Sequence, residues 1–230
     1  MKDINYPISA EPSATRGSAK LRITEIFLSL QGEARDVGWP TVFVRLTGCP
    51  LRCHYCDTAY AFSGGSAMSL DEVLSKVADY AVSHVTVTGG EPLAQRSVLP
   101  LLVALCDAGY TVSLETSGAL DVSAVDPRVV KVVDLKCPDS GESGKNRLEN
   151  LQHLGTRDQI KFVISGRKDY EWACTQLKAF DLVTRVEVLF SPVHDQLEPT
   201  MLAEWILEDR LPVRFQIQLH KYLWGEAAGR

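Results

Sequence analysis

The feature that most constrains the fold is an alternation, from Thr41 onward, of apolar runs of strand length with helical patterns. Seven such runs occur, at residues 41–46, 84–89, 110–116, 129–135, 158–164, 185–190 and 215–219. Parallel strands need long crossover connections, and both faces of a parallel sheet must be covered. Seven units fall short of the eight that close a β/α barrel. We therefore expect an α/β fold, a partial (open) β/α barrel of about six to seven mostly parallel strands, with a flat doubly wound sheet as the alternative.

The segment between the first two runs predicts a helix. Ser69 and Glu72 have the spacing of a capping box, and Val73, Val77 and Tyr80 give the helix an apolar face. Residues 1–20 are rich in Ser, Ala, Pro and charge and have no hydrophobic periodicity, which is typical of a mobile leader. We expect a single domain over residues 21–230.

The charge balance argues against a nucleic-acid partner. The chain has 24 Lys and Arg against 29 Asp and Glu, so it has no excess of positive charge to neutralise phosphates. It contains no run of about 18 apolar residues that would span a membrane, and residues 1–20 lack the apolar block of a secretory signal. We expect a cytoplasmic protein, in which the six cysteines serve metal binding or catalysis more often than disulfides.

Residues suited to binding or catalysis follow four successive strand runs. Cysteines follow the run at 41–46, Gly89-Gly90-Glu91-Pro92 ends the second, residues 115–118 end the third and residues 134–136 the fourth. Because the carboxyl ends of parallel strands meet at one edge, we expect these groups to share one site.

The cysteine segment predicts a metal centre. Cys49, Cys53 and Cys56 are separated by three and two residues, which lets one short loop wrap a metal group. Ferredoxin-type sites give four cysteines to a cubane, whereas three leave one iron open to bind something else. A structural zinc site usually has a fourth ligand. His54 is the best nearby donor, so a non-catalytic zinc-binding module is the alternative from a different class of protein.

The CxxxCxxC spacing, with the aromatic Tyr55 before the last cysteine, resembles the radical S-adenosylmethionine superfamily. The segment from Thr88 to Pro92 resembles the GGEP segment of the same superfamily. The resemblance implies a [4Fe-4S] cluster on the three cysteines, whose open iron binds S-adenosylmethionine. It also implies that Gly90 and Glu91 meet the cofactor's amino group, and a carboxylate is a suitable partner for an ammonium.

Four segments narrow the resemblance to the 7-carboxy-7-deazaguanine synthase family: Ser29–Glu33, Phe43–Cys49, Cys56–Thr58 and Gln218–Tyr222. This family implies a lyase that converts 6-carboxy-5,6,7,8-tetrahydropterin to 7-carboxy-7-deazaguanine with loss of ammonia, in queuosine and 7-deazapurine biosynthesis. It implies Mg²⁺ as a further cofactor, a flavodoxin or ferredoxin as electron donor, and a homodimer. A glycyl-radical activating enzyme, which carries a similar cysteine loop, is the alternative within the superfamily.

The same resemblance implies roles for individual residues. Substrate contacts fall on Leu30, Gln31, Gly32, Arg45 and Thr88. Cofactor contacts fall on Tyr55, Cys56, Asp57, Gly90, Glu91, Asp134, Leu135, Lys136, Ser191, Pro192, Val193 and His194. Thr58 corresponds to a magnesium ligand, and His220 adjoins the family's C-terminal segment.

Arg45 also has a physical argument of its own. Its guanidinium can fork onto the substrate carboxylate, and a charge within the run TVFVRL would be costly without a partner or ligand. Two features remain without an assigned role. The cysteines at 106, 137 and 174 receive no role, and Leu223–Arg230 extends past the family's C-terminal segment.

Overall fold

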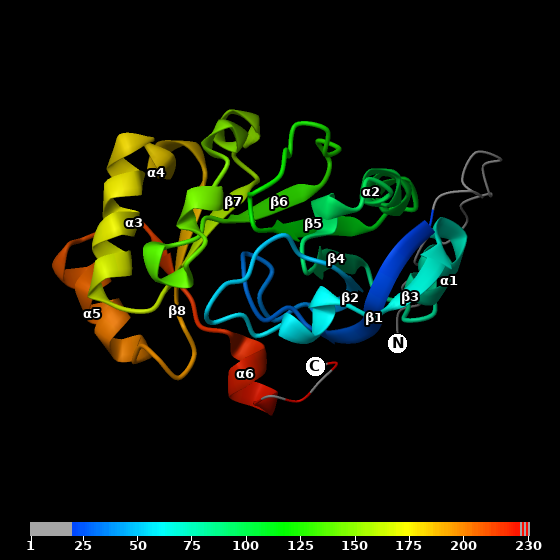
Figure 1. The fold of residues 1–230 in the computed structure, drawn as a ribbon, viewed down its shortest axis with the longest axis horizontal. Helices are drawn as coiled ribbons and strands as arrows, with labels where there is room; N and C mark the ends of the chain where they lie inside the picture. The colour runs from blue at the N-terminus through cyan, green and yellow to red at the C-terminus, as the bar shows by residue number, and fades with distance from the viewer. Residues whose placement is uncertain (1–19, 226, 228, 230) are drawn as a thin grey trace, which may run out of the picture.

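The computed structural model describes residues 20–225, Ala227 and Gly229. The leader expected over residues 1–20 lies outside the described residues, except for Lys20, which begins the first strand. The described chain forms one nine-stranded sheet in the order β3-β1-β2-β4-β5-β6-β7-β8-β9 (Figure 1). The strands are β1 (Lys20–Leu30), β2 (Pro40–Leu46), β3 (Ser66–Ser69), β4 (His84–Gly89), β5 (Thr111–Thr116), β6 (Val130–Asp134), β7 (Gln159–Ile164), β8 (Glu187–Pro192) and β9 (Arg214–Phe215).

Helices connect most of the parallel strands. The α-helices are α1 (Leu70–Ala78), α2 (Val98–Asp107), α3 (Arg167–Ala179), α4 (Leu182–Arg185), α5 (Pro199–Glu208) and α6 (Leu219–Trp224). Short 3₁₀ turns are η1 (Ala59–Phe62), η2 (Pro92–Ala94), η3 (Pro138–Ser140), η4 (Ser143–Lys145) and η5 (Leu148–His153). No helix in the described ranges combines the length and the apolar character that a bilayer span requires.

The expected fold class is confirmed. β2 and β4–β9 pair in parallel, and β3 and β9 occupy opposite ends of the sheet, so the barrel is open in the described part of the chain. Six of the predicted runs correspond to β2 and to β4–β8, whereas the run predicted at 215–219 shares only Phe215 with the two-residue strand β9, and its last residue, Leu219, begins α6. The structure adds β1 and β3, which extend the sheet by antiparallel pairing.

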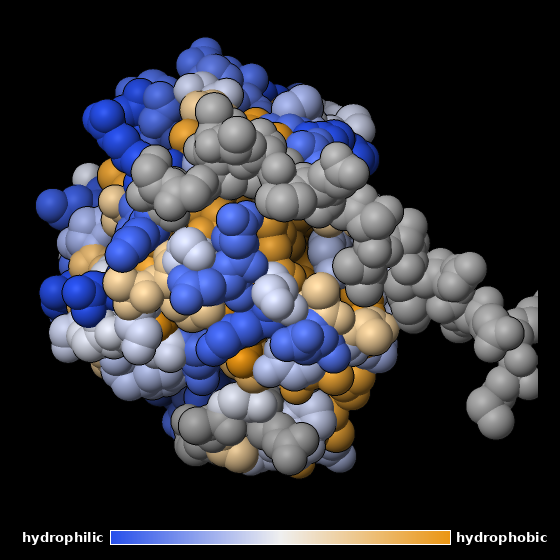
Figure 2. All heavy atoms as spheres, turned by 90° about the vertical axis from the view of Figure 1, so that its right-hand side faces the viewer, coloured by the Kyte–Doolittle hydropathy of each residue, from blue (hydrophilic) through white to orange (hydrophobic). Residues whose placement is uncertain are grey.

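The predicted capping box at the start of α1 is present. The Ser69 hydroxyl accepts a hydrogen bond from the backbone N–H of Glu72, and the Glu72 carboxylate accepts one from the Ser69 backbone. Val73 and Val77 are fully buried, and the Tyr80 hydroxyl donates to the Ile26 carbonyl of β1. Figure 2 views the side of the molecule that carries α1, β1 and β3, where hydrophobic residues lie among hydrophilic ones.

Successive residues of each parallel strand face opposite sides of the sheet, and the two sides differ in chemistry. Val42, Val44 and Leu46 of β2 are fully buried in a core with α1 and α2, and β7 and β8 contribute to a second core with α3 and α5. The alternate positions carry polar groups, such as Arg45 of β2 and Lys161 of β7. We call these two sides the helix-covered face and the inner face.

The connection from β1 to β2, residues 31–39, crosses the inner face. Ala34 packs against Val132 and Leu189, and its backbone N–H donates to the Gln216 side chain at 2.8 Å. The next backbone N–H, of Arg35, donates to Gln159 of β7 at 2.8 Å. The connection therefore bridges the two ends of the parallel sheet and brings residues 31–33 to the interior.

Candidate active site

The three predicted cluster cysteines lie in the loop that follows β2, at the C-terminal edge of the sheet. The loop is joined to the end of β4, because the Glu91 backbone N–H donates to the Gly48 carbonyl at 2.7 Å. A Cβ atom on Gly90 would collide with that same carbonyl oxygen, and one on Gly89 would lie 2.8 Å from the Leu46 carbonyl oxygen. Both glycines are thus required by the close approach of two backbones.

The cysteine thiols are free and half-buried. Burial is the main cause that raises the pKa of Cys49, and it raises the pKa of Cys53 to about 11. Each of these thiols also lies within electrostatic range of Cys56. Such thiols need a metal cation to be stabilised as thiolates, so the donor set fits a three-thiolate cluster with one open iron.

No three His, Cys, Asp or Glu side chains in the described residues are already arranged around a metal position. The assignment of Cys49, Cys53 and Cys56 as cluster ligands therefore stays a prediction. His54, the donor considered for a zinc site, has Nδ1 3.0 Å from the Asp139 carbonyl oxygen, and its ring packs against Gly141. Its contacts are thus with the segment after β6.

That segment anchors the cysteine loop at two points. The backbone N–H of Arg52 donates to the Glu142 carboxylate at 2.6 Å, and the backbone N–H of His54 donates to the Ser140 carbonyl at 3.0 Å. Arg52 also lies over the Phe62 ring at 4.3 Å. The loop that carries the cysteines is therefore held at Arg52 and His54, the residues on either side of Cys53.

Glu91 is fully buried and already has four hydrogen-bond donors. Its carboxylate accepts bonds from the Thr116 hydroxyl at 2.9 Å, from the Ser117 backbone and hydroxyl at 2.7 and 2.6 Å, and from the Leu93 backbone at 2.9 Å. Glu91 thus joins the ends of β4 and β5. Its expected contact with the cofactor amino group stays a prediction.

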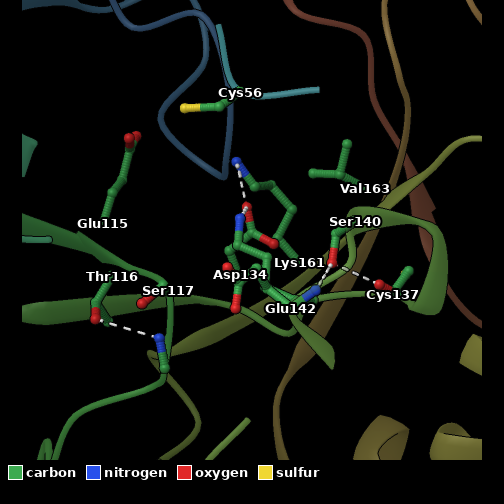
Figure 3. A network of polar contacts seen from close by, with 12 residues as sticks. Cys56, Glu115, Thr116, Ser117, Asp134, Cys137, Ser140, Glu142, Lys161 and Val163 are labelled. Atoms are coloured by element: carbon green, nitrogen blue, oxygen red, sulfur yellow. Dashed lines mark hydrogen bonds and ion pairs between the residues drawn. The ribbon is translucent and has the colours of Figure 1, made fainter. Parts of the chain in front are cut away.

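A buried charge cluster occupies the inner face beneath the cysteine loop. Lys161 Nζ lies 2.6 Å from Glu33 and 3.6 Å from Asp134, and Lys136 Nζ lies 3.0 Å from the same Asp134 oxygen. The other oxygen of Asp134 is buried and has no hydrogen-bond partner in the described residues. The side chains of Glu115, Asp134 and Lys161 lie on the same side of the strands as that of Cys56 (Figure 3).

The carboxylic acids of this cluster have divergent pKa values. Burial tends to raise the pKa of Glu33, but the ammonium of Lys161 lowers it to about 2. Burial raises the pKa of Glu115 above its ordinary range, against the opposing effect of Lys161. The pKa of Lys161 is raised because the neighbouring carboxylates outweigh desolvation. Two carboxyl groups beside one ammonium therefore favour different protonation states.

The predicted substrate residues border this cluster. Thr88 donates from its hydroxyl to Glu115 at 3.1 Å, and the Gln31 side-chain amide donates to Thr86 at 2.9 Å. Gly32 lies against the imidazole of His220, so closely that a Cβ atom would collide with the ring. Leu30 ends β1 and is half-buried. The structure thus brings Gln31, in the connection from β1 to β2, against β4, the strand that carries Thr88.

Arg45 has a protein partner as well as a place at the site. Its Nε donates to Glu25 at 2.7 Å, and its Nη1 lies 3.4 Å from the Gly89 carbonyl. The sequence argument predicted that the Arg45 charge needs a partner or a ligand, and the half-buried guanidinium has a partner in Glu25. Its contact with a substrate carboxylate stays a prediction.

Leu135, a predicted cofactor residue, is instead fully buried in the second core, and the other remaining predicted cofactor residues lie around the mouth of the barrel. The Tyr55 hydroxyl donates to the Val163 carbonyl at 3.3 Å, and the Gln218 side chain donates to Asp57 at 3.3 Å. Ser191 and Pro192 end β8, followed by Val193 and His194. A pocket of about 240 Å³ opens between Pro192, His194, Gln218 and Tyr222.

Comparison with known proteins identifies the family. Residues 43–134 match the Radical SAM superfamily. The chain is 46% identical over 213 residues to the 7-carboxy-7-deazaguanine synthase of Chlorobaculum tepidum, covering 91% of this chain and 97% of that protein. It is 46% identical over 219 residues to the enzyme of the same name from Koribacter versatilis, covering 89% and 97%. The chain belongs to the 7-carboxy-7-deazaguanine synthase family.

The fold agrees with this assignment. The crystal structure of QueE from Escherichia coli superposes with a TM-score of 0.74 and 25% sequence identity, and the match covers 87% of this chain and 95% of that one. As a radical S-adenosylmethionine enzyme, the chain uses a [4Fe-4S] cluster and S-adenosylmethionine.

Two charged residues of the site, Glu33 and Lys161, had no role predicted from the sequence, whereas Glu115 belongs to the segment 115–118 that was expected at the site. Glu33 ends the segment Ser29–Glu33, and its carboxylate accepts hydrogen bonds from Gln216 and Gln218 as well as Lys161. Lys161 had a usable signal, because it is a charge within the apolar run QIKFVI. The same argument that singled out Arg45 applies to it.

Proposed function

We propose that this synthase converts 6-carboxy-5,6,7,8-tetrahydropterin to 7-carboxy-7-deazaguanine with loss of ammonia, in queuosine and 7-deazapurine biosynthesis. The observation that carries the proposal is the polar inner face, which adjoins a three-cysteine loop at the carboxyl ends of parallel strands. Arg45 offers a guanidinium for the substrate carboxylate. Thr88 and Glu115 offer a hydroxyl and a carboxyl group for the polar edges of a pterin.

Cys49, Cys53 and Cys56 would hold the cluster in this proposal. When bound, the cluster and S-adenosylmethionine supply the radical chemistry of the reaction. The chain's own residues orient the substrate and exclude water. Lys136 and Lys161 keep the carboxylates of the interior compensated, so the site can receive an anionic substrate without leaving several buried negative charges unpaired.

The finer parts of the proposal concern partners. Thr58 would bind Mg²⁺ through its hydroxyl together with substrate oxygens. A flavodoxin or ferredoxin would deliver the electron, and the enzyme would act as a homodimer in the cytoplasm. Residues 21–230 would form one domain, which agrees with the continuous sheet of the described residues.

The test is an anaerobic incubation of the purified, reconstituted enzyme with the carboxypterin, S-adenosylmethionine and a reductant. We expect ammonia and 7-carboxy-7-deazaguanine, identified by mass, and about four irons per chain. Reactions without S-adenosylmethionine, or without the pterin, are the controls. A colourless zinc protein, or an iron protein that leaves the pterin unchanged, would contradict the proposal.

A further inference from the structure

Arg45 is held by a second residue that faces it across the sheet. Glu25 of β1 lies directly opposite Arg45 in the antiparallel pairing of β1 with β2. The register shifts between Ile23 and Glu25, which is the position of a β-bulge. A bulge re-aims the side chains that follow it, and here the Glu25 carboxylate lies 2.7 Å from Arg45 Nε.

Tyr60 completes the arrangement from a different element. It lies in η1, two residues after Thr58, and its hydroxyl donates to the same Glu25 oxygen at 2.8 Å. The Arg45 guanidinium carbon lies 5.9 Å from the ring centres of both Phe27 and Tyr60. The guanidinium is thus bonded at Nε and lies over two aromatic rings.

These contacts leave the terminal edge of the guanidinium for a ligand. Nε is used by Glu25, Nη1 makes only the 3.4 Å contact with Gly89, and Nη2 has no hydrogen bond in the described residues. A guanidinium grips a carboxylate through two parallel N–H groups, and a fixed plane loses less freedom when it does so. Arg45 therefore presents a pre-oriented binding edge, and Glu25 compensates its charge.

The ion pair is not needed to join the two strands. β1 and β2 pair continuously from Glu25↔Arg45 to Leu30↔Pro40, and Phe27 stacks on Phe43 in the middle of that pairing. The Arg45 and Glu25 side chains are 15% and 22% exposed, so the pair is largely withdrawn from solvent at the edge of the site. A purely structural pair would not require the additional hydroxyl of Tyr60.

We infer that Glu25 and Tyr60 are positioning residues that orient Arg45 and thereby make the site select a pterin that carries a carboxylate. This inference rests on the proposed function, since it names how that site distinguishes its substrate. Because Tyr60 follows the cysteine loop closely, carboxylate recognition is tied to the same segment that carries Cys56 and Thr58.

The test measures binding to the anaerobic holoenzyme with S-adenosylmethionine, by calorimetry. Two ligands are compared, 6-carboxy-5,6,7,8-tetrahydropterin and 6-methyl-5,6,7,8-tetrahydropterin, which lacks the carboxylate. We expect Glu25→Ala to weaken binding of the carboxypterin about 10-fold, roughly 1.4 kcal/mol, and to leave the methylpterin unchanged. Glu25→Gln keeps an oxygen for Arg45 Nε and should lose about 3-fold, and Tyr60→Phe should lose about as much.

Tyr80→Phe is the matched control. It also removes one tyrosine hydrogen bond to β1, at the neighbouring Ile26, but on the helix-covered face. It should change binding of neither ligand. In an Arg45→Met background, Glu25→Ala should have no further effect, because a positioning residue acts only through the residue that it positions.

The possible results separate the two proposals. The inference about Glu25 and Tyr60 is overturned if Glu25→Ala weakens binding of both ligands equally. It is also overturned if Glu25→Ala leaves the preference for the carboxypterin intact while Arg45→Met abolishes that preference. If the parent enzyme has no preference for the carboxypterin and Arg45→Met changes nothing, the assignment of Arg45 in the proposed function fails instead, and the inference fails with it.

Discussion

The two faces of the same parallel sheet are built for different tasks. On β2, Val44 and Leu46 point to the helix-covered face and are fully buried among apolar side chains, whereas Arg45 between them points to the inner face. On β7, Phe162 is buried in the second core, and its neighbour Lys161 bonds to Glu33. Adjacent residues thus serve stability and chemistry in turn, because a strand alternates its side chains.

The inner face is stabilised in a different way from the core. Burial of a large aliphatic side chain contributes about 1.5–3 kcal/mol, while a buried charge costs several kcal/mol unless a partner compensates it. The inner face meets that cost with the pairs Lys161–Glu33, Lys136–Asp134 and Arg45–Glu25. The comparison implies that mutations on the two faces should be distinguishable by what they damage.

The largest effect is expected in the cysteine loop, at the C-terminal edge of the sheet. Cys49→Ala, Cys53→Ala or Cys56→Ala should abolish cluster binding, because two thiolates do not hold a cubane with an open iron. Iron content and the visible spectrum of the anaerobically reconstituted protein measure this. Cys106→Ala, Cys137→Ala and Cys174→Ala are the controls and should keep both iron and activity. Normal iron in the first set, or its loss in the second, would mean that other ligands hold the cluster.

The faces themselves are compared by two neighbouring substitutions. Leu46→Ala should lower the free energy of unfolding by about 2–5 kcal/mol, since it leaves a cavity in the core, while the folded fraction keeps its affinity for the carboxypterin. Arg45→Lys should weaken carboxypterin binding by about 1.5–3 kcal/mol, because the ammonium lacks the planar fork. Urea unfolding measures the change in stability, and calorimetry with the carboxypterin and with S-adenosylmethionine measures the changes in affinity. A loss of cofactor affinity in Arg45→Lys with carboxypterin affinity unchanged would contradict the role of Arg45.

The buried pair on the inner face should show a characteristic pH dependence. The pKa of Glu33 falls from an ordinary 4.5 to about 2 in the folded protein, so its stabilising contribution is present above pH 4.5 and is lost as the pH falls toward 2. That contribution is at most about 3 kcal/mol. Glu33→Gln should therefore be less stable than the parent at pH 7 and approach it at low pH, as measured by urea unfolding at several pH values. A difference that stays constant from pH 7 to pH 3 would rule out this ionisation as its source.

The sequence predicts the helix-covered face better than the inner one. Six of the seven parallel strands and the cap of α1 follow from local apolar patterns, because apolar burial is a property of each segment, whereas the run at 215–219 overlaps the short β9 only at Phe215. β1 and β3 were missed since their burial is mixed and they pair antiparallel at one edge of the sheet. The order of the strands in the sheet depends on pairing between segments that are far apart in the sequence, and a local pattern does not predict such pairing.

The lysines of two strands show why the site is harder to predict. Lys131 lies in the apolar run VVKVVDL and Lys161 in DQIKFVI, so the two look alike in sequence. Lys131 pairs with Asp158 at 3.0 Å, near the start of β6, whereas Lys161 pairs with Glu33 in the site. The two lysines differ only in the face of the sheet toward which the side chain points, and that face is set by where the strand begins. This direction distinguishes a lysine of a structural ion pair from a lysine of the site.

The smallest expected effect concerns Thr58, at the exit of the cysteine loop. Its hydroxyl makes no capping bond to η1 and lies 3.8 Å from Cys56 Sγ, so the hydroxyl is available as an oxygen ligand. If it binds Mg²⁺, adding Mg²⁺ to chelated enzyme should raise turnover, and Thr58→Ala should blunt that response while iron content stays normal.

Two further substitutions separate metal ligation from packing at the same position. Thr58→Ser keeps the oxygen and should retain part of the Mg²⁺ response, whereas Thr58→Val keeps the shape and should lose it. If the hydroxyl instead supports the loop, the Ala and Val variants should lose iron, and their remaining activity should depend on Mg²⁺ as the parent's does. That pattern would remove Thr58 from the metal site. A partial Mg²⁺ response confined to the Ser variant, with iron unchanged in all three, is the result that ligation requires.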